Sequence, residues 1–233
     1  PLKMALSSIK NKIFFLTLLF LPTQLGKHFW PDFSVVFGIR VDYLSPTIYL
    51  TDILILLLFL TWIVSVSKNR ISNIKNQISK IKIGALVALL MVGILLSKSP
   101  TLGLYGLLKL VEFGFFGFYT ANYLQGKTQS VYKLITICFV IGIIFESLLG
   151  ISHYLNQGSI GGVIYFFGER EFNQSTPGIA NASINGELIL RPYGTFPHPN
   201  VLSAYLLIAM TIVISNIIPP TAGQISKTGK IIF

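Results

Sequence analysis

Six stretches of the chain are apolar over about the length that a helix needs to cross a bilayer. A helix rises about 1.5 Å per residue, so a hydrocarbon core about 30 Å thick takes roughly 20 residues. The stretches are 13–25, 46–66, 83–96, 102–124, 131–155 and 199–218. They predict an all-α polytopic membrane protein with about six transmembrane helices in a single transmembrane domain, and one long loop, 156–198, between spans five and six.

Composition supports a membrane protein and argues against a soluble one. Apolar residues make up 52% of the chain, charged residues make up 11%, and the mean hydropathy is +0.70, whereas soluble domains average about 25% charged. The net charge of +10 does not require a nucleic-acid partner, because cations on one side of a membrane explain it. The single cysteine, Cys138, lies in an apolar run, and no Cys or His cluster suggests a metal. We therefore expect no metal, no cofactor and no nucleic acid.

The basic residues predict the orientation of the spans. With six spans and the N-terminus inside, the inner side would hold twelve cations and none of the eight acids: Lys3, Lys10, Lys12, Lys68, Arg70, Lys75, Lys80, Lys82, Lys127, Lys133, Lys227 and Lys230. The outer side would hold five: Lys27, Arg40, Lys98, Arg170 and Arg191. Cytoplasmic loops carry the excess of Lys and Arg. This asymmetry predicts a multi-pass protein of the cytoplasmic (inner) membrane with its long loop outside.

The first apolar run has an alternative interpretation as a secretory signal peptide, because three lysines precede it. Residues 21–25 lack the small-residue cleavage pattern, however, and five further apolar segments follow. We therefore interpret 13–25 as a retained span.

The long loop contains a strong signal for a β-hairpin. Asn185-Gly186 separates two short segments, 179–184 and 187–191, and Asn-Gly is the preferred pair for a tight hairpin turn. We expect a small hairpin that ends at Arg191. Earlier in the loop, Arg170 stands between two acids and is expected to pair with them; these are Glu169 and Glu171.

The segment 191–200 reads Arg-Pro-Tyr-Gly-Thr-Phe-Pro-His-Pro-Asn and runs directly into an apolar helix. Its prolines favour an extended approach, Pro199 suits a first helical turn, and His198 suits the N-cap. The free N–H groups of a helix start favour anions, and an arginine guanidinium matches phosphate oxygens in a fork. We predict that Arg191 binds phosphate and that four residues position the loop and the helix start: Gly194, His198, Pro199 and Asn200. The alternative is that Arg191 only ties down the hairpin.

The pattern Arg-x-x-Gly-Thr-Phe-x-His-Pro-Asn before a small-residue apolar helix resembles the signature of the O-antigen ligase-like membrane proteins, which include O-antigen ligases and polysaccharide polymerases. The resemblance implies a GT-C-like glycosyltransferase that moves a glycan from a polyprenyl-diphosphate carrier to a lipid, glycan or protein acceptor at the outer face. In that family the histidine base and a second arginine come from a later outer loop. We therefore expect these 233 residues to be the N-terminal half of a protein of about twelve spans, inactive alone.

Charged side chains within spans need an explanation, because burial in hydrocarbon is costly. Lys109 and Glu112 are three residues apart, so they either neutralise each other or line a channel. Glu146 shares one helical face with three other residues: Gly142, Gly150 and His153. It is expected to pair with Lys109 or Arg191, to line a channel or, like His198, to serve as a base. The functional alternative to glycosyl transfer is a transporter or channel for an anionic solute.

Overall fold

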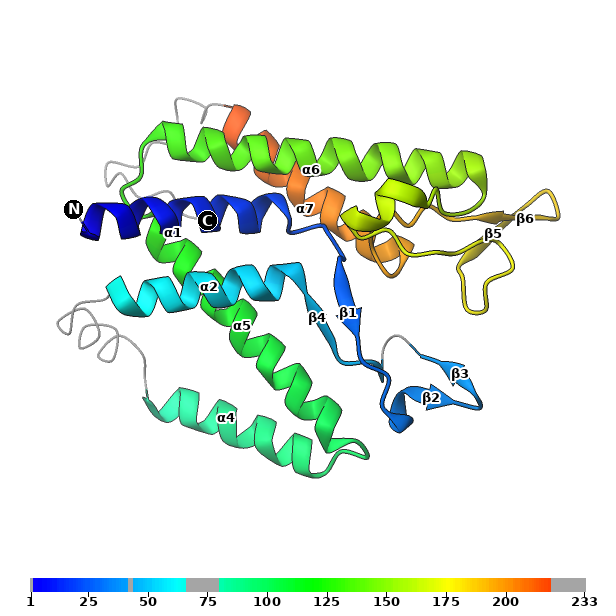
Figure 1. Ribbon diagram of the computed structural model, residues 1–233, viewed down its shortest axis with the longest axis horizontal. Coiled ribbons are helices and arrows are strands. Elements are labelled where there is room, and N and C mark those ends of the chain that lie inside the picture. Colours follow the sequence, from blue (N-terminus) through cyan, green and yellow to red (C-terminus); the bar gives the residue numbers. More distant parts are fainter. Residues whose placement is uncertain (1, 42–43, 66–79, 219–233) are drawn as a thin grey trace. The chain divides into compact units, whose positions relative to one another are not determined.

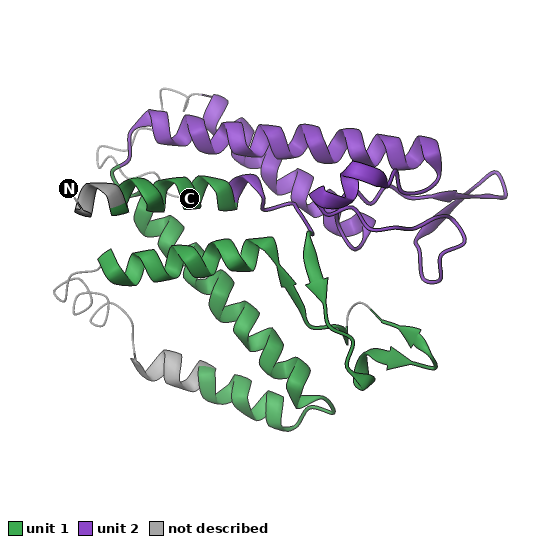
Figure 2. Ribbon diagram, in the orientation of Figure 1, with its two compact units in different colours: residues 1–17, 25–126 green, residues 18–24, 127–233 purple. Residues whose placement is uncertain are grey.

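The structure is a computed structural model, and it describes residues 2–41, 44–65 and 80–218. The chain is mostly helical (Figure 1), with α1 (Leu2–Leu19), α2 (Leu50–Ser65), α4 (Lys80–Leu95), α5 (Pro100–Leu124), α6 (Gln129–Asn156) and α7 (Pro199–Ile217). It divides into two compact units (Figure 2). Unit 1 comprises Pro1–Thr17 and Leu25–Gly126, and unit 2 comprises Leu18–Gln24 and Lys127–Phe233.

Three of the described helices, α5, α6 and α7, are both long and apolar enough to cross a membrane. They correspond to the expected spans 102–124, 131–155 and 199–218, and they indicate a membrane protein. The other three expected spans fall short for identifiable reasons. Helix α1 carries three lysines within 18 residues, whereas α2 and α4 have 16 described residues each, and these border the segment 66–79, which lies outside the described residues. Sixteen residues reach only about 24 Å, less than a hydrocarbon core of about 30 Å.

Unit 1 also contains short strands, so the expectation of an all-α fold is wrong in this detail. Strand β1 (Gly26–His28) pairs antiparallel with β4 (Thr47–Tyr49), and a hairpin of β2 (Val35–Val36) and β3 (Ile39–Arg40) lies between them in sequence. A 3₁₀ turn, η1 (Asp32–Ser34), precedes β2. The ladder continues as the Leu50 amide donates to the Leu25 carbonyl at 2.9 Å. The strands satisfy backbone groups in the connection between α1 and α2.

The core of unit 1 is aromatic where α1 meets α5. Phe14 is fully buried, and its ring lies against Phe116, Tyr119 and Tyr123 at centroid distances of 4.6–6.0 Å. Such tilted aromatic pairs stabilise beyond the area that they bury.

Unit 2 is built on the packing of α6 against α7. The buried face of α6 includes Gly142, Glu146, Gly150 and His153, which confirms that these residues share one face. A Cβ at Gly142 would overlap the hydroxyl of Tyr205 on α7, so the missing side chain is what allows this close approach.

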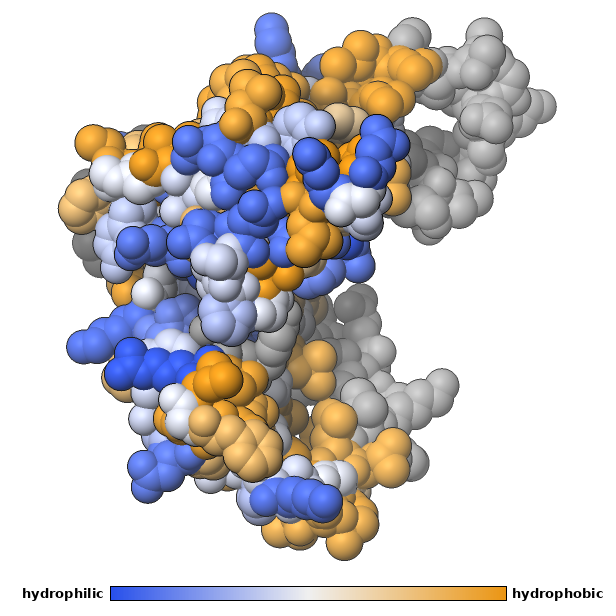
Figure 3. All heavy atoms as spheres, turned by 90° about the vertical axis from the view of Figure 1, so that its right-hand side faces the viewer, coloured by the Kyte–Doolittle hydropathy of each residue, from blue (hydrophilic) through white to orange (hydrophobic). Residues whose placement is uncertain are grey.

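The loop that joins α6 to α7 contains a 3₁₀ helix, η3 (Gly162–Phe167), and the expected hairpin of β5 (Asn181–Ile184) and β6 (Glu187–Leu190). Asn185 and Gly186 both have positive φ, 53° and 87°, so the hairpin prediction is confirmed. Strand β6 ends immediately before Arg191. On unit 2, the upper group of atoms in Figure 3, hydrophilic side chains lie beside hydrophobic ones on the side of Figure 1 where β5 and β6 lie.

Candidate functional site

The start of α7 is held by the hairpin and by a buried tyrosine. The Arg191 amide donates to the carbonyl of Ala180 at 3.1 Å, which extends the hairpin ladder by one residue. Tyr193 is 2% exposed, and its hydroxyl accepts the Ala180 amide at 2.6 Å while its ring packs on Phe172. The approach to α7 is therefore anchored on both sides of Pro192.

His198 is the N-cap of α7, and Pro199 occupies the first helical turn, as predicted. The Nδ1 atom of His198 accepts the Asn200 amide at 3.2 Å. A neutral imidazole has one donor nitrogen and one acceptor nitrogen, so a ring that accepts through Nδ1 carries its proton on Nε2. In this arrangement Nε2–H is available as a donor.

Arg191 reaches the same helix start. Its Nη2 atom donates to Oδ1 of Asn200 at 2.9 Å, which joins two residues of the predicted site across nine positions of sequence. The structure adds a second arginine that sequence reasoning missed. Nη2 of Arg170 donates to the carbonyl of Pro197 at 3.0 Å, so the two guanidinium groups bond to residues on either side of His198. The amides of the first turn are already bonded, that of Asn200 to Nδ1 of His198 and those of Val201 and Leu202 to the His198 carbonyl. The helix dipole still adds positive potential at the same place.

Glu146 is fully buried, and its partner is the turn that precedes α7. Oε2 accepts the amide of Thr195 at 3.0 Å, and Oε1 lies 2.8 Å from the Thr195 hydroxyl. Gly194, with φ of +59°, has no room for a Cβ because that atom would overlap this carboxyl group. The expected pairing of Glu146 with Arg191 is therefore wrong, since Arg191 bonds to Asn200 and Glu146 bonds to Thr195.

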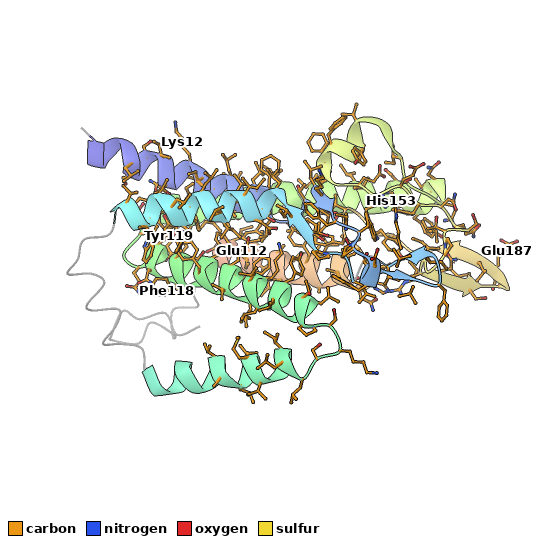
Figure 4. All side chains as sticks on the ribbon, turned by 60° about the horizontal axis from the view of Figure 1, so that its bottom comes forward. Lys12, Glu112, Phe118, Tyr119, His153 and Glu187 are labelled. Carbon is orange, nitrogen blue, oxygen red and sulfur yellow. The ribbon has the colours of Figure 1, made fainter. Side chains whose placement is uncertain are left out.

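A second buried polar contact, also missed from sequence, joins the end of α6 to the loop. Nε2 of His153 lies 2.7 Å from Oε1 of Glu169, and both side chains are buried. The Glu169 carboxylate also accepts the amides of Ile160 and Gly161 at 2.7 Å each. Figure 4 labels His153 on α6 and Glu187 on the hairpin. These contacts clamp the loop onto the end of α6.

In unit 1, Lys109 lies between two carboxylates. It forms an ion pair with Asp52 and a second with Glu112, at 3.8 Å, and its ammonium lies over the rings of Tyr49 and Tyr105. Oδ2 of Asp52 also accepts the Tyr49 amide at 2.8 Å. Lys109 lies within ion-pair distance of Glu112, as its spacing suggested, but its nearer partner is Asp52, which sequence spacing did not reveal. These contacts favour a structural role over channel lining.

Within the described ranges, no group of three or more His, Cys, Asp or Glu side chains is arranged to hold a metal ion. No protein-family model, no curated protein and no solved structure matches the chain. The resemblance to the O-antigen ligase-like proteins therefore stays a prediction from the residues of the 191–200 segment.

Proposed function

We propose that this chain is part of a membrane glycosyltransferase of the O-antigen ligase or polymerase type, with six spans and both ends in the cytoplasm. It would bind the diphosphate of a polyprenyl-diphosphate glycan at the outer face of the cytoplasmic membrane. The glycan would then pass to a lipid, glycan or protein acceptor.

The observation that carries the proposal is the placement of Arg191 at the first turn of α7. Asn200 holds one nitrogen of the guanidinium, which restricts the side chain before any ligand binds. A guanidinium has five N–H donors and stays charged at all relevant pH values, so it can grip phosphate oxygens as a fork. The positive end of the α7 dipole favours the same anion.

The proposal gives His198 a binding role. Its Nδ1 atom caps the helix, and its Nε2–H can donate to a phosphate oxygen. Glycosyl transfer also requires a base for the acceptor hydroxyl, and none is assigned among the described residues.

The test is binding of polyprenyl diphosphate by the purified chain in lipid nanodiscs, with polyprenyl monophosphate of equal chain length as the comparison ligand. Arg191→Lys keeps the charge but loses the fork. A lost charge-assisted hydrogen bond costs about 1.5–3 kcal/mol, so affinity for the diphosphate should fall about 10- to 100-fold. Affinity for the monophosphate should change much less.

Arg40→Lys is the matched control, because Arg40 stacks on Trp30 in unit 1 and its replacement should leave binding unchanged. Wild-type affinity in Arg191→Lys would mean that Arg191 only holds the helix start. Saturable uptake of a soluble anion into sealed proteoliposomes, without binding of the lipid diphosphate, would favour the transporter instead.

A further inference from the structure

The buried carboxyl group of Glu146 meets one hydroxyl group that has two acceptors within reach. Oγ1 of Thr195 lies 2.6 Å from the carbonyl of Pro22 and 2.8 Å from Oε1 of Glu146. A threonine hydroxyl carries a single proton, and a carbonyl oxygen can only accept. The hydroxyl therefore cannot donate to both oxygens.

Both short contacts of the Thr195 hydroxyl can be hydrogen bonds if the Glu146 carboxyl group is protonated and donates one of them. With the proton on Oε1, Glu146 donates to Oγ1 of Thr195, and Oγ1 donates to the Pro22 carbonyl. Oε2 still accepts the Thr195 amide at 3.0 Å. Every polar atom in this chain of contacts then has a hydrogen-bond partner. If Glu146 were ionised, Oγ1 of Thr195 would face either the Pro22 carbonyl oxygen at 2.6 Å or Oε1 of Glu146 at 2.8 Å with no hydrogen between them.

The surroundings of Glu146 give no compensation for a negative charge. Its exposed fraction is zero, and no lysine, arginine or histidine in the described part of the chain forms an ion pair with it. The Tyr205 hydroxyl of α7 lies against Gly142, one turn before Glu146, and His153, two turns along α6, is already paired with Glu169. Burying an unpaired carboxylate is far more costly than burying a hydrogen-bonded carboxylic acid.

We infer that Glu146 is a protonated positioning residue: its carboxylic acid group fixes the turn 193–196 between Arg191 and His198 and takes no part in chemistry as a base. The turn is fixed on both sides, since Gly194 lies directly against the carboxyl group and Thr195 bonds to both of its oxygens. Thr195 also ties the turn to the segment 18–24 of the same unit through Pro22. The positioning part of this inference rests on the proposed function, whereas the protonation does not.

The Glu146→Gln variant distinguishes a protonated positioning residue from an ionised carboxylate that acts as a base. In Glu146→Gln the amide nitrogen donates to Thr195 Oγ1 and the amide oxygen accepts the Thr195 amide, which reproduces the protonated acid at the cost of one extra N–H. We expect the unfolding temperature to stay within about 3 °C of wild type, and polyprenyl-diphosphate affinity to stay within about threefold. Glu146→Ala leaves the turn unsupported, so it should lower the unfolding temperature and weaken binding about tenfold or more.

A second pair of variants tests the hydroxyl. Thr195→Ser keeps the donor and acceptor, and it should behave as wild type. Thr195→Val has nearly the same shape but leaves the Glu146 proton without an acceptor, so it should lower the unfolding temperature clearly more than Thr195→Ser does.

Infrared difference spectroscopy can detect the proton on the Glu146 carboxyl group directly. Wild type minus Glu146→Gln should contain the C=O stretching band of a protonated carboxylic acid, shifted in D₂O. The matched control is Glu187→Gln, at an exposed position on β6, whose difference spectrum should contain carboxylate bands and no band of a protonated carboxylic acid.

Absence of the protonated-acid band would overturn the protonation. Loss of stability in Glu146→Gln as large as in Glu146→Ala would overturn it as well. If Glu146→Ala binds polyprenyl diphosphate as wild type does, the positioning role is wrong. If the wild-type chain binds no polyprenyl diphosphate, the proposed function fails, and the spectra and unfolding temperatures still decide the protonation.

Discussion

At the scale of single residues, the approach to α7 depends on Gly194, whose φ of +59° places it in the left-handed region. A Cβ there would also overlap the carboxyl group of Glu146. Gly178 has a similar φ, +79°, but a Cβ at that position would meet nothing within 4 Å. Both glycines therefore have a backbone conformation that disfavours other residues, but only at Gly194 would a side chain also meet a steric clash.

Gly194→Ala should consequently destabilise the protein more than Gly178→Ala does. The backbone term alone costs about 1–2 kcal/mol, and forcing a methyl group into a filled site costs about 1–3 kcal/mol more. The measurement is thermal unfolding of the two variants and wild type in the same detergent. Equal losses in both variants would show that the contact between Gly194 and Glu146 is looser than the structure has it.

The residues of the α7 start were predictable because their roles are local. Proline geometry and capping act over a few positions, so His198 and Pro199 were placed correctly from sequence. The partners of Glu146 and His153 were not predictable in this way. Thr195 lies 49 residues from Glu146, and Glu169 lies 16 residues from His153, and only the folded loop brings them together. Arg170 was missed for the same reason, because its partner, Pro197, is 27 residues away.

At the scale of elements, the close packing of α6 on α7 depends on Gly142 and Tyr205. A Cβ at Gly142 would overlap the Tyr205 hydroxyl, and the next ring atom lies 3.4 Å away. At Gly150, one of the other glycines on this face, a Cβ would make ordinary contacts with Pro192 and Leu202 at 3.4 and 3.6 Å. The hydroxyl of Tyr205 is thus the specific obstacle at Gly142.

Gly142→Ala should be destabilising in wild type and tolerated in a Tyr205→Phe background. Overpacking costs about 1–3 kcal/mol, and removing the hydroxyl should recover most of it, which appears as a coupling energy in a double-mutant cycle. Gly150→Ala is the control and should be neutral or slightly stabilising, since alanine favours a helix. The cycle is measured by thermal unfolding of wild type, the two single variants Gly142→Ala and Tyr205→Phe, and the double variant, with Gly150→Ala unfolded alongside. Additive losses from Gly142→Ala and Tyr205→Phe would mean that the helices do not meet at this point.

The helices and the hairpin follow from sequence more directly than the other strands do. Long apolar runs predicted the positions of α5, α6 and α7 to within a few residues, and Asn185-Gly186 predicted the turn between β5 and β6. Strands β1 and β4 are three residues each and show no alternation of polar and apolar residues. Their pairing depends on how the ends of α1 and α2 are joined, which no local pattern encodes.

At the scale of the whole molecule, the number of membrane crossings and their direction rest on two different signals. Among the residues that the structure describes, length and composition give three helices that can cross. Charge asymmetry predicts six crossings with both ends inside, because that arrangement puts twelve of the eighteen cations on the cytoplasmic side. The two counts differ in helices α1, α2 and α4.

Single cysteines in a Cys138→Ser background test the six-span topology. We expect a membrane-impermeant thiol reagent to label a cysteine at Ser175 in intact cells and to leave cysteines at Ser72 and Gln129 unlabelled until the membrane is opened. Ser175 lies in the loop between α6 and α7, Gln129 begins α6, and Ser72 lies outside the described residues, in a basic stretch of the sequence. The reason is electrostatic, since moving Lys68, Arg70 and their neighbours to the outer face would reverse the usual cation bias. Labelling at 72 or 129 in intact cells would place the basic loops outside and remove Arg191 from the face on which a polyprenyl-diphosphate glycan is proposed to bind.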